Sequence, residues 1–463
     1  MRVFIIRENK EWEMYMKNRV LLNVICMILV LIFGVFVSFG LMVVIYSLPT
    51  YSVEKNVEQS LDIFEREGDY YDIFPGNIGS RLDNFTDIYF MQMCFIKGSD
   101  NSIDNALSSY GLDYTSKDCS PTKDLIAYFN GTKKEIIPRE TRFWNGYVII
   151  LKPMLRFFNY SQIRMINLSL QIILMCAVIL LIHKKLGFGY VIPVILTWIS
   201  LNPVVVSLNI FYSTIVFSTF IPVLIMLVFN DKIEKYNLYY LFVMLVGMET
   251  TLFNMNSSIA MPGAICIIMY YMLNLKKITD FKTSIKKMSL LAFSWLLGAL
   301  GMWASNWILS SLFTDNYSLW QAFTTAQERT STRGWMTRPW AIRRNWETLW
   351  SDSGWRMCAY IFGLSVIIYL IILMARKNID VKKFNRKNLL DLFWLVIFSL
   401  IPFCWYWFMP SHSCIHAHFT YRTFSIGILA STYIPIYILK AIRIEGGSNE
   451  KQLRNIDNYA LLK

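Results

Sequence analysis

Charged residues are scarce in this chain. Asp, Glu, Lys and Arg make up 17% of its 463 residues, whereas hydrophobic residues make up 55%. Soluble domains carry about 25% charged and about 45–50% apolar residues, because a folded surface must be hydrated. The shortage excludes a compact soluble enzyme. Intrinsic disorder is excluded as well, since 16% aromatic residues at low charge density would collapse in water.

Cysteine and the common catalytic motifs are also scarce or missing. Eight Cys residues in this length are too few for a secreted disulfide scaffold. The sequence has no Gly-rich phosphate loop, CxxC pair, GxSxG elbow or HExxH motif. The sequence also lacks the alternation of strands and helices that would predict a soluble nucleotide-binding domain. An activated substrate must therefore reach a site outside or within the membrane, and we expect it to arrive from the lipid phase.

Long apolar runs are what the sequence has in abundance. A helix needs about 20 apolar residues to cross a bilayer. Together the runs predict an all-α polytopic membrane protein with about ten transmembrane helices, folded as a single integral-membrane domain over residues 1–463. The candidate spans are 20–47, 161–182, 188–206, 209–229, 238–254, 258–274, 288–313, 357–375, 390–409 and 421–440. The pair 188–206 and 209–229 forms either two spans or one broken unit, because Asn202-Pro203 separates them.

The Lys and Arg residues predict the orientation. Alternate short connections are rich in these residues, which favours a cytoplasmic location for them and for both termini, 1–19 and 441–463. Two large extracytoplasmic loops follow, 48–160 and 314–356. The basic residues behind the net charge of +13 then set the orientation and attract anionic membrane lipids. They are scattered over several loops and form no single patch, which argues against nucleic-acid binding.

The first outer loop contains two acidic candidates. Its start, 51–67, has helical apolar spacing and predicts an amphipathic helix on the membrane surface. Asp83 and Asp87 follow at a spacing of four, which places both carboxylates on one helix face. Such a carboxylate can act as general base for a hydroxyl nucleophile. The alternative is structural: Asp83 caps the helix and Asp87 pairs with Arg81.

The second outer loop is rich in Arg and Trp. Six Arg and no Lys occur between 329 and 356, and six Trp occur between 320 and 355. The guanidinium fork suits phosphate or carboxylate groups, and Trp suits the membrane interface. The loop is either a lipid-phosphate or anionic glycan site or an interfacial belt that binds phospholipid headgroups. The candidate phosphate ligands are Arg333, Arg338, Arg343 and Arg344, together with Arg142 before the apolar run that ends at 158.

Three of the four His residues fall within seven positions near the last predicted span. His412 and His416 have the spacing of a helical metal pair, and Arg422 follows. The cluster predicts that these His residues and Arg422 bind a phosphate or polarise a leaving group. A divalent metal ion bound with an Asp, and ordinary interfacial His residues, are the alternatives. No cofactor is otherwise indicated.

These features together resemble the GT-C superfamily of integral-membrane glycosyltransferases. The shared features are a cytoplasmic N-terminus, one span, a long outer loop with early acids (Asp83 and Asp87), many further spans and an Arg-rich outer loop. The family often has adjacent or near-adjacent acids, whereas these two are four apart. The segments RFWNGY (142–147) and HSCIHAHFTYR (412–422) are also similar to multi-spanning proteins of bacterial surface-polysaccharide loci.

The resemblance implies transfer of a sugar from a polyprenyl-phosphate donor to a cell-surface glycan or lipid acceptor, outside a bacterial plasma membrane. Asp83 or Asp87 would deprotonate the acceptor, and the Arg and His residues named above would hold the donor phosphate. The alternative functions are a transporter (flippase) or a polymerase of lipid-linked polysaccharide.

Overall fold

The computed structural model describes residues 2–113, 120–132, 134–139, 141–254, 258–316 and 318–443, and within these ranges it is predominantly helical. Seven helices are long and apolar enough to cross a membrane, as expected of an all-α polytopic membrane protein. They are α1 (Arg2–Ser47, apolar from Leu22), α8 (Tyr160–Leu186), α11 (Ile210–Lys235), α14 (Phe281–Phe313), α17 (Ser353–Ala375), α18 (Arg386–Phe408) and α21 (Phe424–Ile442, whose apolar segment begins at Ala417). The predicted cytoplasmic tail lies outside the described residues from 444 onward.

The other three predicted apolar stretches coincide with shorter helices. These are η2 with α9 (Phe188–Tyr190 and Val191–Ser200), α12 (Tyr239–Phe253) and α13 (Ala260–Leu273). The stretch 188–206 is interrupted at Asn202, whose φ is +57°, and Pro203 then starts α10 (Pro203–Leu208). Proline has no N–H to continue α9, so a new helix begins there.

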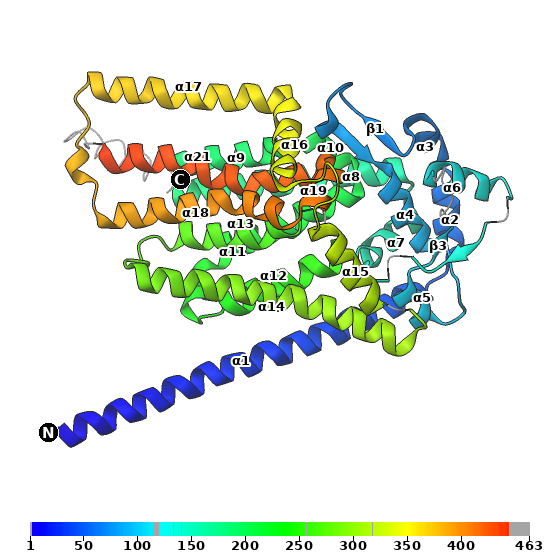
Figure 1. The fold of residues 1–463 in the computed structure, drawn as a ribbon, viewed down its shortest axis with the longest axis horizontal. Helices are drawn as coiled ribbons and strands as arrows, with labels where there is room; N and C mark the ends of the chain where they lie inside the picture. The colour runs from blue at the N-terminus through cyan, green and yellow to red at the C-terminus, as the bar shows by residue number, and fades with distance from the viewer. Residues whose placement is uncertain are drawn as a thin grey trace, which may run out of the picture.

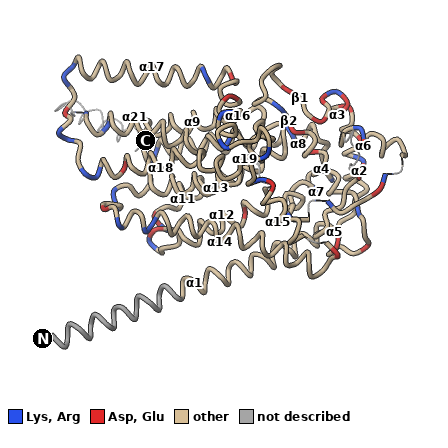
Figure 2. The backbone as a smooth tube through the Cα atoms, viewed as in Figure 1, with Lys and Arg blue, Asp and Glu red and all other residues tan. Residues whose placement is uncertain are grey.

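The two ends of the bundle differ in charge (Figures 1 and 2). Connections rich in Lys and Arg gather at one end, which we call the basic end. The segments 48–159 and 314–352 cover the opposite end, which we call the loop end. In Figure 1 the helix α17 lies along one edge of the bundle, and α14 and α1 lie toward the opposite edge.

Glycine allows α12 and α14 to pack closely against each other. A Cβ atom on Gly247 would lie 2.2 Å from the Trp295 carbonyl oxygen, and one on Gly298 would lie 2.0 Å from the Met244 carbonyl oxygen. Small residues at such crossings let the two backbones approach, which is how membrane helices gain packing energy without a hydrophobic driving force.

The first outer loop forms a layer of short elements across the loop end (Figure 1). The predicted single helix over 51–67 is instead two helices, because the chain turns at Gln59-Ser60. β1 and β2 form an antiparallel hairpin that pairs Tyr70 with Asp83 and leads into α4. The elements are α2 (Tyr51–Glu58), α3 (Leu61–Glu67), β1 (Tyr70–Asp72), η1 (Ile78–Ser80), β2 (Arg81–Asp83), α4 (Asn84–Phe95), α5 (Ser102–Ser108), β3 (Gly111–Leu112), α6 (Pro121–Phe129), β4 (Ile136–Ile137) and α7 (Val148–Phe157).

The second outer loop and the His-rich segment meet the first loop. The second loop forms α15 (Ser318–Thr330) and α16 (Arg338–Ser351). The His-rich segment forms α19 (Pro410–Ile415), α20 (Ala417–Thr420) and η4 (Tyr421–Thr423). α16 packs against α19, α20 and η1, and α15 packs against α19. Three segments far apart in the sequence are therefore assembled at one place on the loop end.

Candidate functional site

Asp83 lies at the centre of this assembly. It is the N-cap of α4: its Oδ1 accepts a hydrogen bond of 2.9 Å from the Thr86 N–H. The other oxygen, Oδ2, lies 3.8 Å from Nε2 of His418. That distance is too long for a direct hydrogen bond. The capping role considered from the sequence is therefore present, and one carboxylate oxygen stays available.

Within the part of the chain that the structure describes, two buried polar atoms near Asp83 have no hydrogen-bond partner. One is Nε2 of His418, and the other is the hydroxyl of Tyr212 in the first turn of α11. Asp83 and Arg422 are among the charged groups that act most strongly on this Tyr212 hydroxyl. Buried polar groups in native proteins are nearly always paired, so these two atoms remain able to hydrogen bond to a bound hydroxyl or water. Sequence reasoning missed Tyr212, which nothing in its apolar surroundings marks.

Arg422 holds the assembly together. Its Nε donates to the Leu201 carbonyl at 3.0 Å, Nη1 to the His418 carbonyl at 3.2 Å and Nη2 to the Gly79 carbonyl at 3.5 Å. The guanidinium also stacks on Tyr212, with its carbon 4.1 Å from the ring centre. These contacts use all three nitrogen atoms on backbone carbonyls. The predicted phosphate ligand is therefore a buried cation that positions the loops around Asp83.

Asp87 is engaged on both oxygens. Oδ1 accepts from the Phe211 N–H at 2.9 Å. Oδ2 accepts from the Ile210 N–H at 2.8 Å, from the Asn209 side chain at 3.0 Å and from the Tyr160 hydroxyl. Burial raises the pKa of Asp87 to about 7, although these hydrogen bonds act in the opposite direction. The carboxylate joins α4 to the N-terminus of α11 and does not pair with Arg81, which instead binds Asp72 at 2.7 Å.

A buried ion pair supports the same junction. Arg164 of α8 donates through both terminal nitrogens to Glu67 of α3, each at 2.8 Å, and also to the side chain of Asn84 at 3.0 Å. Both partners of the pair are less than a tenth exposed. Planar two-point pairing of this kind fixes orientation as well as charge. The first outer loop is therefore fastened to the membrane helices on two sides of Asp83.

The two predicted His ligands lie beside this site. His412 and His416 have ring centres 5.0 Å apart, and His416 and His418 have ring centres 6.1 Å apart. Burial is the main cause that lowers the pKa of His416 to about 3, so this imidazole is neutral near pH 7. Within the described ranges, no group of three or more His, Cys, Asp or Glu side chains is arranged to hold a metal ion. The residues present do not fit the metal alternative.

The predicted Arg ligands of the second outer loop lie on and before α16. Arg343 is exposed and forms an ion pair of 2.7 Å with Glu347. Arg338 donates to the Trp407 carbonyl at 3.2 Å, and Arg344 stacks on Trp335 at 5.1 Å. Arg333 is exposed in the turn before α16. Arg–Trp stacking at a bundle end fits the interfacial belt, and the exposed guanidinium groups are accessible to headgroup phosphates.

Arg142 lines a different cavity. Together with Arg329 it borders a space of about 300 Å³ at the loop end of α14. Trp295, Trp303 and Trp307 line the same space, and the Trp307 indole donates to the Arg142 carbonyl at 2.9 Å. Arg329 also acts electrostatically on His416. Two guanidinium groups over an indole-lined cavity can bind an anionic headgroup at the membrane interface.

An apolar groove of about 650 Å³ runs along α8, α11 and α12 within the bundle. Its lining is almost wholly hydrophobic, with Glu249 as an ionisable residue, bonded at 2.8 Å to Ser218. Ile210 lines the groove at the loop end, and the preceding Asn209 donates to the Asp83 carbonyl oxygen at 3.1 Å. One residue therefore separates the groove lining from the backbone of the Asp83 site.

Comparison with known proteins adds no assignment: no protein-family model, curated protein or solved structure matches this chain. The functional argument therefore depends on the geometry of Asp83, His418, Tyr212 and the adjoining groove.

Proposed function

We propose that this protein is a GT-C-like membrane glycosyltransferase that transfers a sugar from a polyprenyl-phosphate donor to a glycan or lipid acceptor. By the positive-inside rule, the loop end faces away from the cytoplasm and both termini face it, in a bacterial plasma membrane. The ten apolar stretches then act as ten membrane segments, of which three are short. The observation that carries the proposal is Asp83, a buried carboxylate with one available oxygen, close to a lipid-sized groove.

The reaction assigns a role to each side chain. Asp83 accepts the proton of the acceptor hydroxyl as its oxygen attacks the anomeric carbon of the donor sugar. The bond from that carbon to the phosphate oxygen breaks, and polyprenyl phosphate leaves with the electron pair. His418 and Tyr212 have buried polar atoms that can hydrogen bond to the reacting groups. Arg142 and Arg329, which border the indole-lined cavity, are the guanidinium groups that would bind the leaving phosphate.

The groove supplies the lipid part of the substrate. Its volume lies within the range of about 300–1,000 Å³ that small-molecule sites occupy, and its hydrophobic lining suits an isoprenoid chain. A donor held there would present its phosphate at the loop end, because the groove lies within the apolar part of the bundle.

A transporter of lipid-linked glycan is favoured by a different feature, the helix break at Asn202-Pro203, since broken helices line the substrate paths of many transporters. The two functions differ in outcome. A transferase breaks the sugar–phosphate bond, whereas a transporter returns the donor intact on the other side of the membrane.

The test is donor turnover by the purified protein in liposomes, with a panel of polyprenyl-phosphate hexoses as donors and neutral oligosaccharides as acceptors. Mass spectrometry measures the released polyprenyl phosphate. We expect release by the wild type and a loss of about 10²–10⁴-fold in Asp83→Asn, the usual contribution of a general base. Asp72→Asn is the matched control: it removes a carboxylate from β1, the strand paired with β2, and should keep full turnover.

Turnover by Asp83→Asn at the wild-type rate would contradict the assignment of the base. Intact donor moved across the membrane, without released polyprenyl phosphate, would replace the transferase with the transporter.

A further inference from the structure

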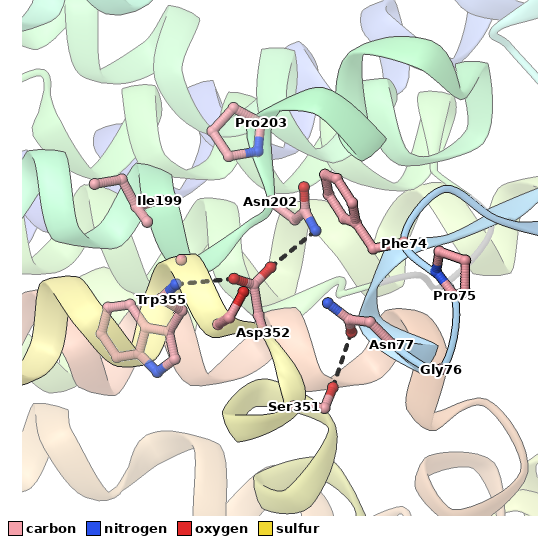
Figure 3. Close-up of a pocket in the computed structure, with 12 residues that line it drawn as sticks. Phe74, Pro75, Gly76, Asn77, Ile199, Asn202, Pro203, Ser351, Asp352 and Trp355 are labelled. Atoms are coloured by element: carbon pink, nitrogen blue, oxygen red, sulfur yellow. Dashed lines mark hydrogen bonds between the residues drawn. The ribbon is translucent and has the colours of Figure 1, made fainter.

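A third cavity, of about 470 Å³, lies at the loop end, where three segments meet (Figure 3). One wall is the turn Phe74–Asn77 before η1, another is the break between α9 and α10 at Asn202, and the third is the junction of α16 and α17 around Asp352. The size is that of a small-molecule site. None of the roles assigned above uses this cavity.

Asp352 provides acceptor positions in this cavity. Its Oδ1 caps α17 by accepting from the Trp355 N–H at 2.8 Å, and its Oδ2 accepts from the Asn202 side chain at 3.0 Å. A carboxylate oxygen has two lone pairs, so each oxygen keeps one acceptor position for a ligand. The two bonds fix the carboxylate in place, as the dashed lines in Figure 3 show.

Asn77 provides an oriented donor. Its side-chain oxygen accepts from the Gly79 N–H at 2.9 Å and from the Ser351 hydroxyl at 2.8 Å. These two donors fix which way the amide is turned. In Figure 3 the amide nitrogen of Asn77 lies on the side that faces Asp352 and Asn202. Acceptors and donors therefore stand side by side, which suits neighbouring sugar hydroxyls, since each hydroxyl both donates and accepts.

The remaining lining selects against anionic ligands. None of the twelve lining residues is Lys or Arg, and Asp352 is their single acid, so phosphate or uronic acid groups would be repelled. Phe74 is half exposed, and its ring supplies aromatic surface for the C–H face of a sugar ring. The chemistry fits a neutral saccharide.

Backbone geometry connects this cavity to Asp83. Asn202 has a left-handed φ of +57°, a conformation that costs energy in a non-glycine residue and often marks functional sites. The carbonyl of the preceding Leu201 accepts from Arg422, which also donates to the carbonyls of His418 and Gly79. Arg422 therefore joins the back of the cavity to the segment that carries His418.

We propose that this cavity binds a neutral sugar residue of the acceptor glycan. The identification of this sugar as part of the acceptor rests on the proposed glycosyl transfer. Saccharide binding itself can be measured separately.

The experiment measures binding of neutral trisaccharides of glucose, mannose, galactose and N-acetylglucosamine to the detergent-purified protein, by saturation-transfer NMR. Trigalacturonate is the anionic comparison. We expect at least one neutral trisaccharide to bind, and about tenfold weaker binding in Asp352→Asn and in Phe74→Ala. Phe74→Tyr keeps the aromatic surface and should bind normally. Asp280→Asn is the matched control, because it alters the Asp cap of α14 outside this cavity.

The inference is overturned if no neutral trisaccharide binds, if trigalacturonate binds equally well, or if Phe74→Ala binds like the wild type. Phe74 caps no helix, so a loss in this variant does not depend on a disturbed α17. Failure of the two proposals is distinguishable. Donor turnover without saccharide binding would refute only the proposed acceptor cavity. Saccharide binding without donor turnover would support the cavity and refute the transferase.

Discussion

At the scale of single residues, two aspartates four positions apart have different surroundings. Asp83 caps α4 with one oxygen and keeps the other beside His418. Asp87 accepts four hydrogen bonds at the start of α11 and is fully buried. A general base needs an oxygen that a substrate proton can approach, so the geometry favours Asp83 for chemistry and Asp87 for stability.

The raised pKa of Asp87 makes a pH-dependent prediction. Its folded pKa of about 7 lies above its ordinary value of 3.8, so its contribution to stability is fully present below about pH 4 and is lost as the pH rises through 7. We expect the melting temperature of the wild type in detergent to fall over this interval more steeply than that of Asp87→Asn, which cannot ionise there. Identical slopes for the two proteins would show that Asp87 does not titrate in the folded state as described.

At the scale of elements, helix breaks and close helix contacts position the site. The break at Asn202-Pro203 provides one wall of the cavity around Asp352 that is proposed to bind a saccharide. The helix α11 starts with the backbone amides that donate to Asp87. Away from the site, α12 and α14 approach closely through Gly247 and Gly298. This contact fixes α12, which carries one wall of the apolar groove.

Alanine substitution tests this close contact. In Gly247→Ala or Gly298→Ala the new methyl group would overlap a carbonyl oxygen, so we expect a loss of about 1–3 kcal/mol of stability and a lower melting temperature. Gly363 in α17 is the control, since a Cβ there meets no atom within 4 Å. Gly363→Ala should leave the melting temperature unchanged or raise it slightly, because alanine favours a helix by about 1 kcal/mol. Equal effects at the three positions would rule out the tight crossing.

At the scale of the whole molecule, polar chemistry and hydrophobic volume meet at one end. The Lys- and Arg-rich connections lie at the basic end, and the two outer loops and the His-rich segment come together at the other (Figure 2). The groove begins near Ile210 and extends into the bundle, so a lipid substrate could enter from the membrane while its polar part remains at the loop end. This arrangement matches a reaction on a membrane-borne donor.

Sequence patterns predict much of this architecture, because apolar run length reports directly on helices in a membrane. Seven of the ten predicted stretches are helices of spanning length, and the candidate Asp83 lies next to one of the three clustered His residues, His418. The pattern could not predict that Arg422 donates its hydrogen bonds to backbone carbonyls or that Tyr212 belongs to the site. Those facts depend on contacts between segments more than 100 positions apart, which no local spacing encodes.

Identification of the lipids that remain bound to the detergent-purified protein tests the central claim most directly. The groove variant Ile221→Trp fills the space between α8 and α11, and Ile368→Trp places the same bulk on the exposed face of α17 as a control. The account predicts polyprenyl phosphate, with or without a sugar, in mass spectra of the wild type and of Ile368→Trp, and its depletion in Ile221→Trp. Bulk phospholipid alone in all three proteins would contradict a polyprenyl-phosphate donor in this groove.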